Sequence, residues 1–127
     1  MVYLICREEF FDRRNPYGTA DRDYEDNHLR FIFFCKGVIE TVKKLGWKPD
    51  IIHIHGWMPS LVPMYLKLFN HDNPLFADSK IVYSIYNGVF EGNLGENMMN
   101  GLLFDEIAEE HLKHLDKPSF NDLNKAA

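Results

Sequence analysis

The chain has 127 residues, of which 46% are hydrophobic and 26% charged, and its formal net charge is −5. This is the size and composition of one globular domain, and the acidic balance argues against the basic patch with which proteins bind nucleic acid. No apolar run approaches the roughly 20 residues of a membrane span and no secretory signal opens the chain, so we expect a cytoplasmic protein without a nucleic-acid or membrane partner.

The first elements are a short strand and a long loop. Tyr3 to Cys6 is an apolar run, and the polar stretch 7–23 contains the turn signal Asn15-Pro16-Tyr17-Gly18. Cys6 and Cys35 each lie in an apolar run, which predicts two reduced core cysteines. Because the chain starts directly in this strand and stops inside a predicted helix, we expect it to be an excised piece of a longer protein.

A long amphipathic helix follows from Asp26. Its last turn contains Lys43 and Lys44, and Gly46 comes directly after it, as at many helix ends. The apolar residues recur at three- and four-residue spacing: Leu29, Ile32, Phe33, Ile39 and Val42.

A second strand and a second helix come next. Ile51 to His55 is too short for a helix and rich in β-branched residues, which predicts a strand. The next helix is expected to take Ser60 as its N-cap, to carry Pro63 in its first turn and to end near Phe69.

The last strand is predicted over Lys80 to Ile85 and ends at Asn87-Gly88. The remainder is predicted to be mostly helical, with loops at 92–95 and near Pro118. Strands and helices therefore alternate along the chain, which indicates an α/β fold with right-handed crossovers and a parallel sheet covered by helices on both faces.

Polar and aromatic residues end two of the predicted strands. They are His53, His55 and Trp57 after the first of these strands, and Tyr86 and Asn87 after the second. Ligands of parallel α/β sheets bind at the carboxyl ends of the strands, so we expect these two segments to lie side by side at one edge, with the loop of Tyr17 near them.

These residues also have structural interpretations. His53 and His55 share one face of a strand and could form a metal pair, but no third ligand has a convincing spacing, so we predict no metal site. Trp57 could stack on a sugar ring or fill the space between strand and helix, and Asn87 could be a turn residue only. No dinucleotide-binding or Walker glycine motif is present, and we predict no cofactor.

Three segments resemble the bacterial glycogen synthase and plant starch synthase family, in the variant of Bacteroidetes-type bacteria. They are FFDRRNPYG, then YEDNHLRFIFFCKGVIETVKKLGWKPDIIHIHGWMPSLVPMYLK, then NPLFADSKIVYSIYN, and they cover about residues 9 to 90. The resemblance implies a retaining glucosyltransferase of the two-domain GT-B architecture, which moves glucose from ADP-glucose or UDP-glucose to an α-1,4-glucan. Residues 1–127 would be part of its N-terminal, acceptor-side Rossmann-like domain.

Several site residues carry over from the family pattern. By resemblance, Tyr17 is the active-site tyrosine of a Tyr-Gly loop and Asn87 the asparagine of a His-Asn pair. His53, His55 and Trp57 match positions of the family's His-x-His-Asp-Trp-His segment.

Three positions depart from that pattern. Gly56 stands where the family usually has aspartate, Met58 where it has histidine, and Tyr86 where the His-Asn pair begins with histidine. Tyr86 could replace the histidine as a hydroxyl donor, whereas Gly56 has no side chain to offer.

The leading hypothesis is therefore a piece of a glycogen or starch synthase-like enzyme, inactive by itself. Its substrate-binding residues would be Tyr17, His55, Gly56, Trp57, Tyr86 and Asn87. One alternative is a non-catalytic glucan-binding or scaffolding relative, and another is a GT-B enzyme with a different donor sugar. An unpaired sheet edge would be left exposed, which we expect a homodimer to cover.

Overall fold

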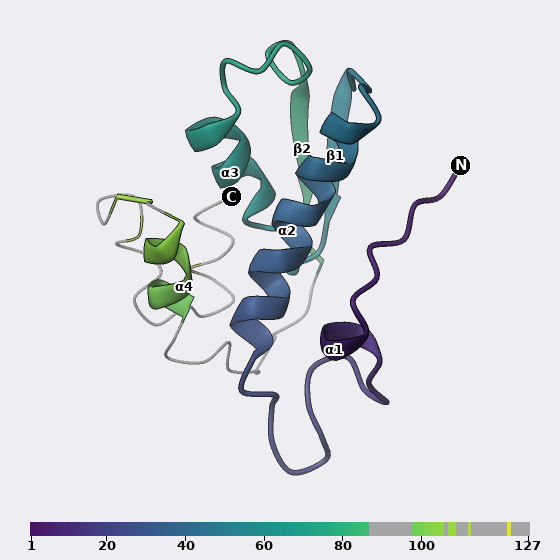
Figure 1. The fold of residues 1–127 in the computed structure, drawn as a ribbon, viewed down its shortest axis with the longest axis vertical. Coiled ribbons are helices and arrows are strands. Elements are labelled where there is room, and N and C mark those ends of the chain that lie inside the picture. Colours follow the sequence, from purple (N-terminus) through teal and green to yellow (C-terminus); the bar gives the residue numbers. More distant parts are fainter. Residues whose placement is uncertain (87–97, 106, 109–111, 113–121, 123–127) are drawn as a thin grey trace.

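The computed structural model describes residues 1–86, 98–105, 107–108, 112 and 122. Its elements are α1 (Glu8–Phe11), α2 (Asn27–Lys44), β1 (Ile51–His55), α3 (Val62–Phe69), β2 (Lys80–Ser84) and α4 (Met98–Phe104). Figure 1 shows the long α2 lying across β1, with α3 beside it and α4 to one side.

The two strands pair in parallel, in a register that joins Ile51 to Lys80 and His55 to Ser84. The helix α3 connects them, which forms the strand–helix–strand unit expected from the alternating pattern. The α/β fold class and its parallel sheet are therefore confirmed. Strand β1 has its predicted bounds, whereas β2 ends at Ser84, one residue before the predicted end.

The core lies between the sheet and the helices, and α2 contacts both α3 and α4. In β1 the burial alternates, because Ile52 and Ile54 face the helices while their neighbours face away. Fully buried side chains of the helices complete this core: Phe31, Cys35, Val62, Met98 and Leu102.

The opposite face of the sheet is open to solvent in the described part of the chain. Ile51 and Val82, which lie on that face, are both exposed. Among the described elements the expected cover is thus found on one face only, since α2 and α3 lie on the same side (Figure 1). This second face carries the apolar side chains of Ile51 and Val82 together with polar ones, among them His53 and His55.

The predicted strand at Tyr3 to Cys6 is wrong. These residues form no strand, because neither β1 nor β2 pairs with them; Ile5 lies beside Gly37 of α2, where an added Cβ would be 3.3 Å from its side chain. Cys6 is exposed rather than buried, which corrects the prediction that both cysteines lie in the core. The loop 7–23 contains the short helix α1, which the sequence pattern missed.

Two details of the helices differ from expectation. Leu61, not Ser60, occupies the N-cap of α3, while Pro63 lies in the first turn as predicted. In α2 the predicted core residue Leu29 is 44% exposed, whereas the polar neighbours Asn27 and Arg30 are buried. The first turn of α2 therefore buries the polar side chains of Asn27 and Arg30, whereas the periodicity predicted a buried Leu29. The loops predicted at 92–95 and near Pro118 lie outside the described residues.

Candidate functional site

The carboxyl ends of β1 and β2 meet at one edge of the sheet, as the sequence predicted. Ile54 pairs with Tyr83 and His55 with Ser84, and the Gly56 N–H donates to the Ser84 carbonyl over 3.1 Å. We call His53, His55, Gly56, Trp57, Ser84 and Tyr86, together with Tyr17, the strand-end rim. Asn87, the remaining predicted site residue, lies outside the described residues.

The imidazoles of His53 and His55 bond to the hydroxyls of Ser84, the last residue of β2, and Tyr86, which follows β2. His55 Nδ1 and Tyr86 Oη are 2.5 Å apart, and His53 Nε2 and Ser84 Oγ are 2.8 Å apart. The two histidine rings lie against each other, with centroids 3.9 Å apart. All of these side chains stand on the solvent-facing side of the sheet or at its edge, so they can reach a ligand without moving the core.

Gly56 turns the chain away from β1 with a left-handed backbone, at φ +73°. This conformation favours glycine, since a Cβ there approaches the carbonyl oxygen too closely. A side chain at this position would start 3.7 Å from Tyr86 Cδ2, an ordinary contact. The glycine that stands in place of the family's aspartate is therefore suited to the turn, and no other described residue comes within 4 Å of a Cβ at this position.

Trp57 packs inside the molecule rather than presenting a free ring face. Its ring stacks on Phe31 of α2, with centroids 5.6 Å apart and planes at 16°. Tyr17 approaches it with centroids 5.0 Å apart and planes at 49°. Of the two interpretations of Trp57, filling the space between strand and helix is the one its contacts support. A direct role in binding sugar stays a prediction.

The Tyr17 loop is closed by its own backbone. Thr19 N–H donates to the Arg22 carbonyl over 2.8 Å, and Tyr24 N–H donates to the Tyr17 carbonyl over 3.0 Å. At Gly18 a Cβ would lie 2.5 Å from the Arg22 carbonyl oxygen, closer than real contacts allow. The glycine after Tyr17 is therefore needed for the close approach of the two sides of the loop.

An ion pair ties this region to α2. Arg13 donates two hydrogen bonds to the carboxylate of Asp26, of 2.7 and 2.5 Å, and its guanidinium lies over the Tyr24 ring at 4.6 Å. These bonds hold the pKa of Asp26 below its usual value. The carboxylate therefore stays ionised and keeps the ion pair intact well below neutral pH.

Met58, the second departure from the family pattern, contributes its backbone to the core. Its carbonyl accepts the Cys35 thiol, with sulfur and oxygen 3.3 Å apart. Burial raises the pKa of Cys35 to about 12, so the thiol stays protonated. Cys35 is therefore a structural residue of the core, as predicted.

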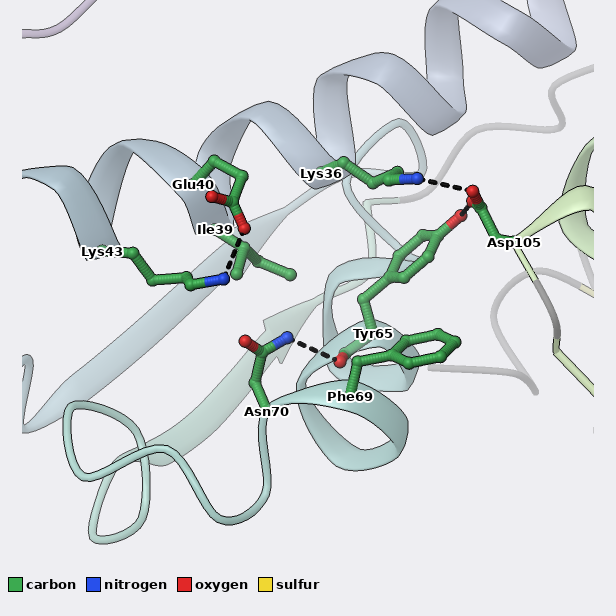
Figure 2. Close-up of a pocket in the computed structure, with 8 residues that line it drawn as sticks. All are labelled: Lys36, Ile39, Glu40, Lys43, Tyr65, Phe69, Asn70 and Asp105. Atoms are coloured by element: carbon green, nitrogen blue, oxygen red, sulfur yellow. Dashed lines mark hydrogen bonds and ion pairs between the residues drawn. The ribbon is translucent and has the colours of Figure 1, made fainter.

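A separate pocket of about 200 Å³ lies between α2, α3 and Asp105. Figure 2 shows that its polar side chains bond one another: Lys36 and Tyr65 both donate to Asp105, and Lys43 pairs with Glu40. Burial, and then the bond to Asp105, raise the pKa of Tyr65. No residue of the strand-end rim lines this pocket, and its polar groups already have partners, so we treat it as a packing feature.

The chemistry open to the strand-end rim is hydrogen bonding. It offers two imidazoles, two tyrosine hydroxyls and one serine hydroxyl, and it contains no lysine or arginine. Among the described residues no group of three histidine, cysteine, aspartate or glutamate side chains could hold a metal ion. Nor does any helix in that part of the chain have the length and apolar character to cross a membrane.

The protein is therefore of the parallel α/β class, with polar and aromatic side chains at the ends of its two strands. The family model described as the starch synthase catalytic domain matches residues 1–127. The chain belongs to this family, and the resemblance noted from the sequence is confirmed.

Curated relatives agree with the family match. The chain is 47% identical over 91 residues to a glycogen synthase of Opitutus terrae, 44% to one of Geotalea daltonii and 41% to one of Vibrio vulnificus. Each alignment covers 72% of this chain and 19% of the relative. The chain thus spans about a fifth of the length of these relatives. No solved structure matches it.

Proposed function

We propose that this chain is the acceptor-side portion of a retaining glucosyltransferase that moves glucose from ADP-glucose or UDP-glucose to an α-1,4-glucan. One observation carries the proposal: His55 and Tyr86, at the ends of two parallel strands, bond each other at the strand-end rim, and Trp57, two residues after His55, contacts Tyr17. Parallel α/β proteins bind their ligands at this edge. The family membership supports glucose transfer as the reaction.

In this proposal the strand-end rim orients sugar hydroxyls through neutral hydrogen bonds. His55 and Tyr86 can each exchange their mutual bond for a bond to a hydroxyl, because a tyrosine hydroxyl both donates and accepts and an imidazole nitrogen does either according to its tautomer. Gly56 leaves open the space in which a sugar ring could approach Tyr86. Asn87 follows directly in the sequence and is proposed to bind the same ligand.

The strand-end rim cannot perform the transfer by itself. Loss of the nucleoside diphosphate builds up negative charge that enzymes stabilise with cations, and no lysine or arginine belongs to this rim. We therefore expect the 127-residue chain alone to be inactive. Its expected cytoplasmic location and its lack of nucleic-acid and membrane partners also stay predictions.

A chimera tests the proposal. The 91 matched residues of this chain replace the corresponding segment of the Opitutus terrae relative, and glucose incorporation into glycogen is measured with ADP-glucose and with UDP-glucose. We expect elongation with one donor, and a drop of at least tenfold in the Tyr86→Phe variant, which loses only the hydroxyl bonded to His55. Tyr83→Phe is the matched control, because Tyr83 packs against the core.

The second candidate is a glucan-binding relative without catalysis. It is favoured by one observation, that Gly56 has no side chain where the family's aspartate stands and adopts a backbone suited to glycine. A chimera that binds maltooligosaccharides but transfers no glucose from either donor would support this candidate and remove the enzyme proposal. Restored transfer in the Gly56→Asp chimera would identify that position as the cause.

We also propose that copies of this chain associate through an exposed edge of the sheet. In the described part of the chain the sheet has two strands, so each strand has one unpaired edge, and Ile51 and Val82 expose apolar surface beside it. Light scattering after size exclusion should give a dimer mass, and Val82→Lys should return the monomer. A monomer at high concentration would contradict this proposal.

A further inference from the structure

Two polar residues of the first turns of α2 are buried, although neither belongs to the strand-end rim. Asn27 and Arg30 are each 3% exposed. A buried amide and a buried guanidinium are unfavourable unless their hydrogen bonds are satisfied, so their partners indicate what they hold in place.

The partners form a continuous relay across three segments of the chain. Arg30 Nε donates to the Phe10 carbonyl over 2.7 Å, and Arg30 Nη1 donates to Asn27 Oδ1 over 2.6 Å. Asn27 Nδ2 then donates to the Tyr17 carbonyl over 2.7 Å. Because arginine can only donate, its bond fixes Oδ1 as the acceptor and leaves Nδ2 to face Tyr17.

The relay ends at the backbone of the residue whose ring contacts Trp57. The Tyr17 carbonyl accepts two bonds, one from Asn27 and one from the Tyr24 N–H. Only the first of these comes from α2, so it attaches the loop to the same helix that supplies Phe31, the other neighbour of Trp57. The position of Tyr17 relative to Trp57 is thus set by α2.

We propose that Asn27 and Arg30 are positioning residues that hold the Tyr17 ring against Trp57. Arg30 orients the Asn27 amide, and Asn27 fixes the Tyr17 carbonyl, so the loop is ordered before any ligand arrives. This goes beyond the proposed function, because it is a property of the chain that holds whichever ligand the strand-end rim binds.

The chain contains a matched control for this role. Asn70, 9% exposed, donates its side-chain amide to the Tyr65 carbonyl over 3.1 Å, the same kind of bond at the end of α3 (Figure 2). If Asn27 were important only for stability, Asn27 and Asn70 variants would behave alike.

Trp57 fluorescence reports the position of Tyr17. In a Trp47→Phe background of the 127-residue chain, Trp57 is the single tryptophan, and acrylamide quenching measures how accessible its ring is. Asn27→Asp keeps an acceptor for Arg30 and loses the donor to Tyr17, so the relay is cut at one bond. We expect its quenching constant to rise at least twofold, as in Tyr17→Ala, and the double variant to show no further rise.

Asn70→Ala should lower the urea midpoint yet leave the quenching constant unchanged. The proposal is overturned if Asn27→Asp leaves quenching unchanged, if Asn70→Ala raises it equally, or if the effects of Tyr17→Ala and Asn27→Asp simply add. Should Asn27→Asp unfold the chain, Arg30→Lys provides the second test: it keeps the charge, loses the fork that orients the amide, and must raise quenching as well. No glucan or nucleotide sugar is used, so failure here is separate from failure of the proposed function.

Discussion

Replacing Gly56 by alanine tests whether the turn after β1 is held in the left-handed region. Among the described residues the Cβ meets Tyr86 Cδ2 alone, at 3.7 Å, so no clash there contributes and the backbone conformation sets the effect. A left-handed residue with a side chain costs about 1 to 2 kcal/mol, and the reduced freedom of the unfolded alanine chain offsets up to about 1 kcal/mol of that. We therefore expect Gly56→Ala to lower the free energy of unfolding by about 1 kcal/mol.

Gly46 is the matched control, since its φ of +60° lies in the same region and no atom in the described part of the chain stands within 4 Å of an added Cβ. Urea unfolding followed by far-ultraviolet circular dichroism should show similar losses for Gly46→Ala and Gly56→Ala. The reasoning is refuted if Gly46→Ala loses about 1 kcal/mol while Gly56→Ala loses nothing. In that case the turn beside Tyr86 can relax without its glycine.

Three further changes test other parts of the structure. Gly18→Ala places a Cβ within 2.7 Å of the backbone of Arg22 and Asp23, so the loop must open. Acrylamide quenching of Trp57 in the Trp47→Phe background should then rise, and unchanged quenching would refute this close approach. Arg13 depresses the pKa of Asp26, so the stability that Asp26 contributes is present above its unfolded pKa of about 4 and is lost as the pH falls through the lower folded value. Asp26→Asn should therefore flatten the acid side of a plot of unfolding free energy against pH. An unchanged acid slope would contradict this role of the ion pair. At pH 8 a thiol reagent should modify the exposed Cys6 rapidly and the buried Cys35, whose pKa is raised to about 12, only in denaturant; two fast thiols would show that Cys35 is accessible.

The sequence predicted most reliably the elements whose pattern is local. The helix α2 and the strand β1 were found because apolar spacing and β-branched composition act over a few residues, and both have the predicted extent. The strand predicted at Tyr3 to Cys6 failed because a strand needs a partner: the composition fits a sheet, but neither β1 nor β2 pairs with this segment.

The candidate site was predictable in part. Parallel pairing brings the residues after β1 and β2 to one edge, which placed His55 beside Tyr86. Periodicity could not identify Asn27 and Arg30, because it counts polar residues as exposed and their bonds reach main-chain oxygens of residues 10 and 17. Leu29, which lies between them in the sequence, is exposed in the structure. The buried face of α2 at this turn is therefore not the one that apolar spacing predicts.

The relay from Phe10 to Arg30 also affects how the molecule folds. Its two bonds to main-chain oxygens join residues 10 and 20 positions apart. Pairing Ile51 with Lys80 closes a loop of about 30 residues, and shorter loops close at a lower entropic cost. The Tyr17 loop can therefore assemble on α2 while the strands are still apart. Pulse-labelled amide exchange during refolding should protect the Tyr24 N–H before the strand amides, which would make the rim's aromatic side the earlier half of the site to form.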